Sequence, residues 1–560
     1  MLFARLRQIN RLSRQKRQLA IHNSGTHSPC NGHQHRQSVH DAKLTRMTRK
    51  ANGATLGGQS SASRINHASF PKNCRRIHGT VISSKHLWCT RRHSIRGQTT
   101  AAVDEVFADL TKPGSPGCAL GIYRDGKIVY AQGYGLANIE ESVAITPRSV
   151  FDIGSTSKQF TAASILLLEK QGKLSVSDDI RKYLPELPDY GQKITILHLL
   201  NHTSGLRDYL TLMELAGIHI DSVTTDEDAL ALISRQKALN FAPGSDWLYS
   251  NTGFFLLSTI VKRVSGKTLR EFAAESIFAP LYMAHTQYRD DHASLIANRA
   301  MAYEQKENKE GYTLDVSYFE QTGDGAVHTS VEDLLLWDAN FYNAKVGGKE
   351  FLAELQEHAK LNNGKVLDYA KGLFLQNYRG LPTVSHGGAW GGYRAELLRF
   401  PEQHFSVACL CNLGNAAPSR RARQVADVYL GSLMKPKDSN KNAGEEETER
   451  DKKEIPIAAE ELRSYAGDYW SQELGVTYRL NVVDGKIKIV AVLDGSAAPR
   501  VNNFTKDALK PTGTREFQVG KSGVTLRFQR SASGGGPTGF ALDAGRTKEL
   551  VFARVPVTGR

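Results

Sequence analysis

Three short groups of residues carry side chains that could support acyl transfer through a serine nucleophile. The first is Ser155-Thr156-Ser157-Lys158, in which a hydroxyl and an amine lie three positions apart. Positions i and i+3 share one face of a helix, so the hydroxyl and the amine point into the same space. A serine at a helix N-terminus also lies beside free backbone N–H groups, which can stabilise an oxyanion.

The S-x-x-K spacing alone is weak evidence, because it occurs five times in the sequence. Each example taken singly is best interpreted as a surface pair, since such a motif is only a hypothesis until its structural context is known. The other four examples are Ser13–Lys16, Ser69–Lys72, Ser234–Lys237 and Ser432–Lys435.

The second group, Tyr249-Ser250-Asn251, is the one Y-x-N in a sequence that holds 20 tyrosines. It follows FAPGSDWL and precedes the apolar run FFLLSTIVKRV. This pattern predicts a loop at the entry of a helix, where polar side-chain tips can reach a cleft.

The third group, His386-Gly387-Gly388-Ala389, leads into a predicted strand. Its two glycines would let the backbone of a substrate approach closely. Taken alone, His386 is more simply interpreted as a hydrogen-bonded histidine at a strand end. The presence of all three groups in this order is therefore the stronger evidence.

The elements that must position these groups form a mixed pattern. GCALGIYRDGKIVYAQGYG predicts two strands around a turn at residues 125–126. STSKQFTAASILLLEKQ predicts a helix from about Ser155 to Gln171, ended by Gly172. Residues 175–370 are predicted to be mostly helical with long loops. Strands are predicted again in VSHGGAWGGYRAELLRFPEQHFSVACLCNL, and a final helix in RRARQVADVYLGSLM. Strands at both ends of a helix-rich middle predict a sheet domain with a helical insertion, over residues 98–434.

The last part of the chain predicts a separate small domain. KPKDSNKNAGEEETERDKKE is charged and almost free of apolar residues, which predicts a linker over residues 435–455. Beyond it, VTYRLNVVDGKIKIVAV alternates with period two around Asp484-Gly485, and TLRFQR, GFALDAG and ELVFARV continue the pattern. Residues 456–560 are therefore predicted to form an all-β barrel or sandwich.

The formal charge of +15 belongs to the first part of the chain. Residues 1–100 hold 19 of the 72 Lys/Arg and one of the 57 acids, so residues 101–560 carry 53 basic and 56 acidic side chains. This distribution argues against a nucleic-acid partner for the body of the protein. The leader, residues 1–97, has three interpretations: a mitochondrial transit peptide, a disordered basic tail, or a start codon placed too far upstream.

The remaining patterns predict neither a metal nor a cofactor. His198 and His202 have the i, i+4 spacing of zinc helices, but no H-E-x-x-H surrounds them. A cluster in the leader is better explained by low complexity: Cys30, His33, His35 and His40. The body's cysteines are expected to be small buried hydrophobes rather than a disulfide framework, and they are Cys118, Cys409 and Cys411. No apolar stretch is long enough to span a bilayer.

The body of the chain resembles the serine β-lactamase-related family, which includes class C β-lactamases, D-Ala-D-Ala carboxypeptidases, D-aminopeptidases and similar esterases. The three motifs of that family appear in order, as Ser155–Lys158, Tyr249–Asn251 and His386–Gly388. The segments LLNHTSGL, VHTSVEDLLLW and HGGAWGGY are also similar, and the resemblance covers roughly residues 100–435. The tail resembles the lipocalin-like β module often appended to such hydrolases.

This resemblance implies an α+β fold, with an antiparallel sheet flanked by helices, a helical subdomain and a following β-barrel-like domain. It implies that Ser155 forms an acyl-enzyme, that neutral Lys158 accepts its proton and that Tyr249 relays the proton to the leaving group. Asn251 would orient Lys158 and donate to the substrate's acyl amide. The backbone N–H groups of Ser155 and Ala389 would form the oxyanion hole.

One departure from the family pattern bears on the substrate. His386 stands where β-lactamases and carboxypeptidases carry a lysine, and histidine is largely uncharged at neutral pH. His386 and Gly388 are therefore expected to orient an ester or a short D-amino-acid peptide. The alternatives are a β-lactamase or D-Ala-D-Ala carboxypeptidase, and a catalytically silent binding protein. The family implies a periplasmic or extracellular location, although no secretory signal is visible, and the oligomeric state stays open.

Overall fold

The computed structural model describes residues 99–436, 454–495, 505, 507–520, 522–531 and 535–556. The predicted leader, residues 1–97, lies outside the described residues. Most of the predicted linker, residues 435–455, lies outside them as well.

A seven-stranded antiparallel sheet forms the centre of the first domain. Its first two strands are joined by Asp125 and Gly126, whose φ angles of 50° and 69° suit the tight two-residue turn that the sequence predicts. The strands follow the spatial order β10 (Tyr369–Ala370), β11 (Leu373–Tyr378), β12 (Leu381–Trp390), β13 (Tyr393–Phe400), β14 (Phe405–Cys411), β1 (Cys118–Arg124) and β2 (Lys127–Tyr134).

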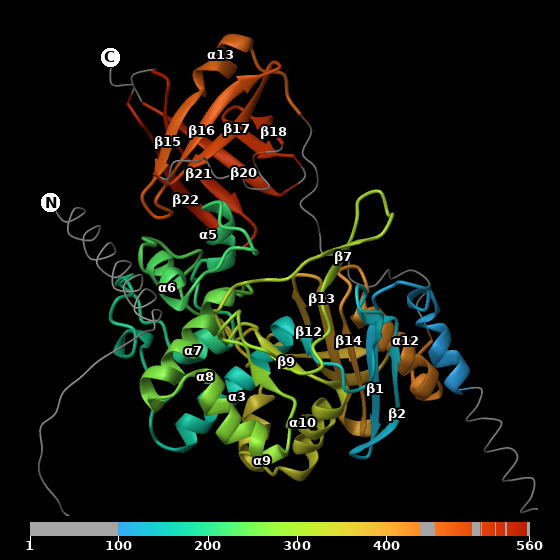
Figure 1. The fold of residues 1–560 in the computed structure, drawn as a ribbon. Helices are drawn as coiled ribbons and strands as arrows, with labels where there is room; N and C mark the ends of the chain where they lie inside the picture. Colours follow the sequence, from blue (N-terminus) through green and yellow to red (C-terminus); the bar gives the residue numbers. More distant parts are fainter. Residues whose placement is uncertain are drawn as a thin grey trace, which may run out of the picture. The chain divides into compact units, whose positions relative to one another are not determined.

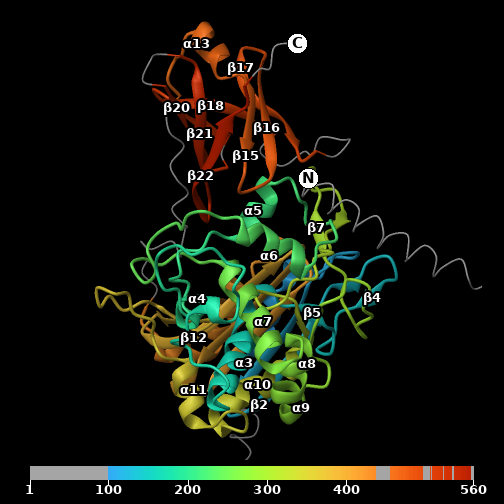
Figure 2. The same ribbon diagram turned by 90° about the vertical axis from the view of Figure 1, so that its left-hand side faces the viewer.

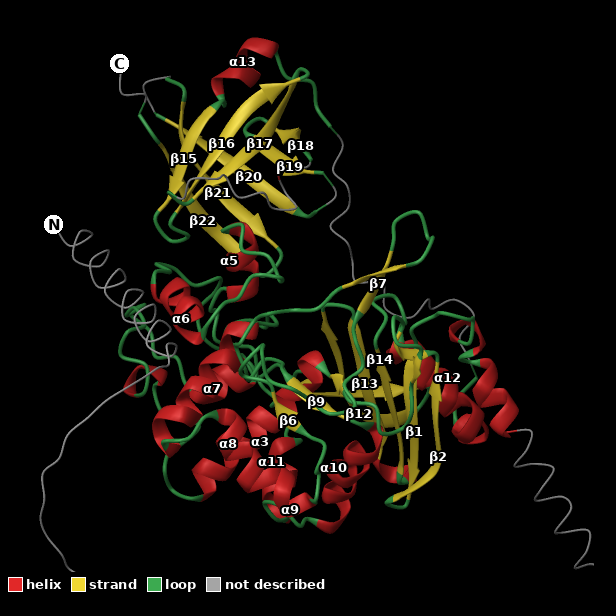
Figure 3. Ribbon diagram, viewed as in Figure 1, coloured by secondary structure: helices red, strands yellow, loops and turns green. Residues whose placement is uncertain are grey.

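Both faces of this sheet are covered, because alternate side chains of its central strands point to opposite sides. On β1, Leu120 and Ile122 pack into a core with helix α12 (Pro418–Leu430). Ala119 and Tyr123, on the other face of β1, join the larger core that holds the helical part of the domain. Helices therefore lie on either side of the sheet (Figures 1 and 3).

The cysteine prediction is wrong for two of the three residues. Cys118 and Cys411 are register partners on β1 and β14, and they form a disulfide. Cys409 is buried and free, as predicted. The sequence did not reveal the bond because the two cysteines are 293 residues apart and become neighbours only when the first and last strands of the domain pair.

The middle of the domain is largely helical, as predicted. Its helices are α3 (Lys158–Lys170), α4 (Ile196–Leu200), α5 (Tyr209–Leu215), α6 (Asp226–Ser234), α7 (Asn251–Ser265), α8 (Leu269–Ala273), α9 (Ala279–Leu281), α10 (Val331–Asn343) and α11 (Lys349–Leu355). Three small sheets accompany them: β3 (Leu136–Asn138) with β4 (Val143–Ala144), β7 (Tyr303–Gln305) with β8 (Tyr312–Leu314), and β9 (Val327–Thr329) between β5 (Phe151–Asp152) and β6 (Gln287–Tyr288).

The helix predicted from Ser155 begins as a tighter turn. Residues Gly154–Ser157 form a 3₁₀ turn, and α3 continues from it. Gly172 follows the helix with a φ of 68°, a left-handed conformation that glycine adopts without strain and that ends helices.

The second domain is a closed eight-stranded barrel, as the period-two pattern predicts. It contains β15 (Gly467–Ser471), β16 (Val476–Val483), β17 (Lys486–Leu493), β18 (Ala508–Gly513), β19 (Glu516–Val519), β20 (Val524–Arg530), β21 (Pro537–Ala544) and β22 (Thr547–Arg554). Helix α13 (Ala459–Ser464) precedes it. Asp484 and Gly485 again join two strands with positive φ angles.

One end of the barrel packs against α5, and both views show the two side by side (Figures 1 and 2). The buried Tyr478 hydroxyl on β16 donates a hydrogen bond of 2.7 Å to the Leu215 carbonyl at the end of α5. In the part of the chain that the structure describes, no helix has the length and apolar character needed to cross a membrane.

Candidate active site

Ser155 lies on the 3₁₀ turn that connects β5 to α3. Asp152 stabilises this turn, since its Oδ1 accepts a hydrogen bond of 2.8 Å from the Gly154 amide. The turn also contacts β12, because Thr156 Oγ1 donates to the His386 carbonyl at 3.0 Å. Ser155 is partly exposed and lines a cavity of about 720 Å³, a size that suits a small-molecule substrate.

Lys158 lies one helical turn further on and is fully buried. Its Nζ donates to Ser155 Oγ at 3.1 Å, to Asn251 Oδ1 at 2.9 Å and to the Asp324 carbonyl at 2.5 Å. Burial lowers the pKa of Lys158 well below the ordinary lysine value, although the nearby Asp324 carboxyl opposes this change. A lysine with a lowered pKa can be neutral near physiological pH and can accept the serine proton.

Tyr249 and Asn251 come from the loop and first residue of α7, as the sequence predicts. Asn251 is held by its own backbone, whose N–H donates to Asp208 Oδ2 at 2.6 Å. The Tyr249 ring lies 4.9 Å from Lys158 Nζ and 4.2 Å from the ring of His202. Asn251 and Tyr249 therefore contact the same lysine.

The Tyr249 hydroxyl is buried and makes no hydrogen bond to any described residue. Burial raises its pKa above the ordinary tyrosine value, and the nearby Ser155 hydroxyl opposes this change. A neutral tyrosine hydroxyl both donates and accepts hydrogen bonds, so Tyr249 can pass a proton between two neighbours without becoming ionised.

Close contact between β12 and the Ser155 turn depends on glycine. A Cβ added to Gly388 would lie 1.9 Å from the Ile153 carbonyl oxygen, and one added to Gly154 would lie 2.7 Å from the Ala389 nitrogen. Gly154 also has a φ of 48°, which a larger residue rarely adopts. Ser155 and Ala389, whose amides are the predicted oxyanion hole, both line the cavity.

His386 is buried on β12 and lines the same cavity. Its Nδ1 donates to the Gly387 carbonyl at 2.6 Å, and its Nε2 has no partner among the described residues. Burial lowers the pKa of His386 to about 3, and the nearby Lys158 acts in the same direction. The pKa of His328, also buried against the cavity, is lowered to about 3 chiefly by burial. We call His386 and His328 the pocket histidines; both are neutral at physiological pH.

The structure therefore brings all seven predicted site residues to one cavity or its wall: Ser155, Lys158, Tyr249, Asn251, His386, Gly388 and Ala389. Sequence reasoning missed Asp208 and Asp324, which surround Lys158 and Asn251. Asp324 lies in the loop between β8 and β9 with no motif around it, so no local signal could have identified it. Arg546 was also missed, because it reaches the cavity from the second domain.

The histidine pair with zinc-helix spacing serves two structural roles. His198 Nδ1 accepts a hydrogen bond from the Thr195 amide at the start of α4. His202 Nδ1 accepts one from the Ser250 amide at 3.2 Å, and its Nε2 lies 2.9 Å from the Tyr369 hydroxyl. His202 thus supports the loop that carries Tyr249.

Two groups of described residues have the composition of a metal site. One consists of the three cysteines of the first domain, two of which form the disulfide. The other consists of Asp291, His292 and Glu320, whose ligand atoms lie within 4.8 Å of one another. Neither group contributes a residue to the cavity that holds Ser155.

The site consists of a serine that is hydrogen-bonded to a buried lysine, on a turn packed against an antiparallel sheet. This arrangement is typical of serine enzymes that use a lysine as the base. The sequence profile of the beta-lactamase family matches residues 103–430, more than half of the chain, and the chain belongs to this family. A penicillin-binding protein of Bacillus subtilis is 33% identical over 301 residues, which are 51% of this chain and 66% of that protein. A D-aminopeptidase of Brucella anthropi is 29% identical over 317 residues, which are 56% of this chain and 59% of that protein.

The chain thus spans less than two thirds of the length of either curated relative. Among solved structures, the octameric penicillin-binding protein homologue from Pyrococcus abyssi superposes with a TM-score of 0.53 at 23% identity. The superposition covers 81% of this chain and 99% of that chain, and it shows a likeness of fold. The predicted family and α+β fold are confirmed.

Proposed function

We propose that the protein is a serine hydrolase that forms an acyl-enzyme on Ser155 and hydrolyses esters or short D-amino-acid peptides. The observation that carries this proposal is the hydrogen bond between the Ser155 hydroxyl and the fully buried Lys158 amine. A serine hydroxyl is a weak nucleophile until a neighbouring base accepts its proton. Lys158 has the position and the lowered pKa that this role requires.

In the first half of the reaction, Ser155 Oγ attacks the carbonyl carbon and its proton moves to Lys158. The oxyanion accepts hydrogen bonds from the Ser155 and Ala389 amides. The carbonyl then re-forms, the bond to the leaving group breaks, and Tyr249 relays the proton from Lys158 to the leaving alcohol or amine. Water hydrolyses the acyl-enzyme in the second half and restores the Ser155 hydroxyl.

Asn251 has a positioning role in this scheme. Its side-chain oxygen accepts from Lys158, so its side-chain amide group is left to donate to the acyl part of a substrate. The backbone N–H of Asn251 donates a hydrogen bond to Asp208, and this bond holds the Asn251 side chain in place at the first turn of α7.

The neutral His386 favours esters and short D-peptides. A fixed ammonium at this position would suit the carboxylate of a β-lactam, whereas the buried His386 supplies an uncharged nitrogen. The D-aminopeptidase name of the Brucella relative supports the same substrates. The name of the Bacillus relative supports the alternative, a penicillin-binding carboxypeptidase or β-lactamase.

Labelling with a fluorophosphonate tests the proposal. Wild-type protein should label and Ser155→Ala should not. Ser432→Ala is the matched control, because Ser432 belongs to another S-x-x-K and is exposed. Labelling of Ser155→Ala at the wild-type rate would overturn the assignment.

The same preparations can then be compared on three substrates. We expect turnover of p-nitrophenyl butyrate and a D-alanyl peptide to exceed turnover of nitrocefin. Faster turnover of nitrocefin would favour the alternative enzyme. Labelling of Ser155 without turnover of any substrate would indicate a binding protein.

A further inference from the structure

The turn between β21 and β22 carries a barrel residue into the catalytic cavity. Arg546 lines the cavity together with Ser155 and Tyr249. Its guanidinium carbon lies 4.7 Å from the centroid of the Tyr249 ring. The cavity of the first domain is therefore completed by a cation of the second.

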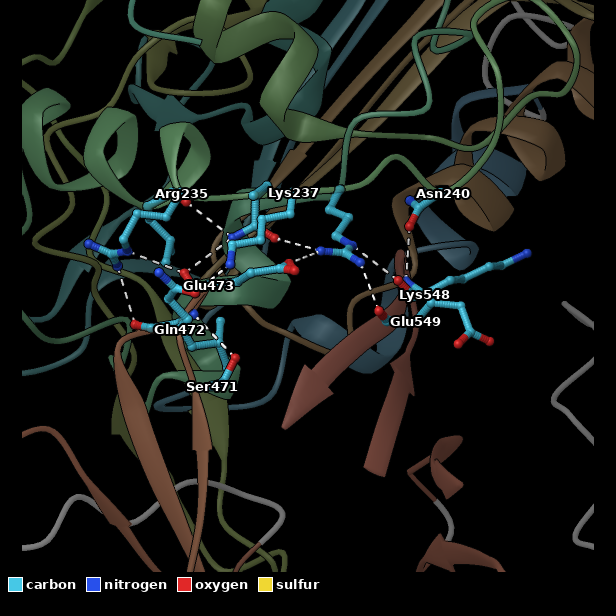
Figure 4. A network of polar contacts seen from close by, with 12 residues as sticks. Arg235, Lys237, Asn240, Ser471, Gln472, Glu473, Lys548 and Glu549 are labelled. Atoms are coloured by element: carbon cyan, nitrogen blue, oxygen red, sulfur yellow. Dashed lines mark hydrogen bonds and ion pairs between the residues drawn. The ribbon is translucent and has the colours of Figure 1, made fainter. Parts of the chain in front are cut away.

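The first domain holds the backbone of this turn in place. Asn240 Nδ2 donates to the Arg546 carbonyl at 2.9 Å, and Asn240 Oδ1 accepts from the Lys548 amide at 2.9 Å. Asn240 and Lys548 face one another at one end of the network in Figure 4. Two bonds from one side chain fix both the position and the direction of the turn.

A buried arginine of the first domain provides a second attachment. Arg207 is fully buried; it donates to the Lys548 carbonyl at 3.0 Å and to the Glu549 carbonyl at 2.9 Å. It also forms an ion pair with Glu473, which lies at the centre of the network in Figure 4. Asn240 hydrogen-bonds to the carbonyl of Arg546, and Arg207 hydrogen-bonds to the carbonyls of the residues at 548 and 549. The side chain of Arg546 therefore starts from a well-defined backbone position.

The guanidinium group of Arg546 is available to a ligand. Its side chain is 42% exposed, and it donates no hydrogen bond to the residues that the structure describes. Arg546 forms a long ion pair of 3.9 Å with the Asp208 carboxylate, which also accepts a hydrogen bond from the backbone amide of Asn251. An arginine presents a planar fork of N–H donors that matches a carboxylate, so an unused fork in a cavity suits a carboxylate ligand.

The charges around the cavity favour the same kind of ligand. Arg289 and Arg394 also line it, but each donates to backbone carbonyls of its own surroundings. The two acids of the lining, Asp152 and Asp324, are buried, and burial raises the pKa of both. Arg546 is therefore the one arginine of the described lining whose guanidinium group donates no hydrogen bond at all.

We propose that Arg546 binds a carboxylate on the leaving group of the substrate, so that the barrel supplies the cation that His386 does not. This inference rests on the proposed function, in which Tyr249 protonates the leaving group. The leaving group must come close to Tyr249 to receive its proton, and the Arg546 guanidinium lies against the Tyr249 ring. Arg546 is therefore placed to contact the leaving group. Preferred substrates then carry a free carboxylate just beyond the bond that is cleaved, as a short peptide with an unblocked C-terminus does.

Two esters with the same acyl group test this assignment: 3-acetoxybenzoate, whose leaving phenol carries a carboxylate, and 3-acetoxybenzamide, whose phenol carries a neutral amide. In both, the Ser155 Oγ–acyl bond forms, the acyl–phenol bond breaks, and the phenol leaves with the relayed proton. The readout is the ratio of kcat/KM for the carboxylate ester to kcat/KM for the amide ester. A charged hydrogen-bonded pair should make Arg546→Ala lower this ratio about ten- to a hundredfold.

Two further variants make the result specific. Arg546→Lys keeps the charge without the fork and should recover part of the ratio. Lys548→Ala removes a charge from the same turn, and the ratio should stay within about twofold of wild type because its exposed ammonium points away from the other labelled side chains in Figure 4.

Other outcomes overturn one claim or the other. If Ser155→Ala hydrolyses both esters like wild type, the proposed function itself fails. If Ser155→Ala is inactive but the ratio for Arg546→Ala stays within about threefold of wild type, only the Arg546 assignment fails. The assignment also fails if Arg546→Ala shifts the pH profile of both esters equally and leaves the ratio unchanged, because Arg546 would then act on Lys158 rather than on the substrate.

Discussion

Replacing Asn251 with aspartate changes one side chain beside Lys158 from neutral to acidic with little change of shape. Lys158 Nζ lies 2.9 Å from Asn251 Oδ1. Two unit charges at that distance attract by about 6 kcal/mol at an effective dielectric constant of about 20. One pKa unit corresponds to about 1.4 kcal/mol, so the upper limit for the rise in the Lys158 pKa is about four units.

Part of this attraction is offset by the desolvation of the new carboxylate, since position 251 is buried. We therefore expect Asn251→Asp to raise the pKa of Lys158 by about two units or more. Neutral Lys158 is the base in this account, so activity increases with pH as Lys158 loses its proton. We call this rise the acid limb of the pH profile. A higher pKa of Lys158 moves the acid limb toward alkaline pH and lowers activity at neutral pH about a hundredfold.

The assay is the pH dependence of kcat/KM for p-nitrophenyl butyrate, which reports the ionisation of the free enzyme. Asn343→Asp is the matched control, because it makes the same change at an exposed position at the end of α10. The reasoning is refuted if the acid limb of Asn251→Asp lies within about half a pH unit of wild type and the activity at neutral pH is unchanged.

Three other predictions follow from the packing and from the buried charges. Gly388→Ala places a Cβ 1.9 Å from the Ile153 carbonyl oxygen and should slow fluorophosphonate labelling about tenfold or more. Labelling of this variant at the wild-type rate would contradict the close contact. Arg207→Met leaves Glu473 buried without its partner and should lower the free energy of unfolding by about 3–5 kcal/mol in urea denaturation; an unchanged midpoint would count against this attachment. The pocket histidines are neutral in the folded protein, whereas in the unfolded chain they take up protons below the ordinary histidine pKa of 6.5. Their contribution to the free energy of unfolding is therefore complete above pH 6.5 and is lost as the pH falls toward about 3. Each should contribute a loss of about 1.4 kcal/mol per pH unit in urea denaturation; His328→Gln should reduce this slope, and a stability independent of pH in this range would argue against buried neutral histidines.

The parts of the fold that local patterns determine were predicted well. The Asp125-Gly126 turn and the helix after Ser155 depend on neighbouring residues, and both are present. The disulfide between Cys118 and Cys411 could not be predicted, because it depends on the pairing of β1 with β14, two strands far apart in the sequence. A pair of cysteines in apolar runs has the same sequence pattern whether it is free or bonded.

The site divides in a similar way. Ser155, Tyr249 and His386 belong to motifs whose order is visible in the sequence, and they line one cavity. Asp324 and Arg546 belong to no motif. Their positions near Lys158 and Tyr249 result from the packing of the loop before β9 against α3 and from the docking of the barrel, neither of which a short pattern encodes.

The central claim is that Ser155 becomes acylated, and peptide-mapping mass spectrometry of protein quenched during ester turnover tests it most directly. The account predicts one acyl group per protein on the peptide that contains Ser155, and none on that peptide in Ser155→Ala. An acyl group on a different residue of the wild-type protein, or turnover by Ser155→Ala at the wild-type rate, would contradict it.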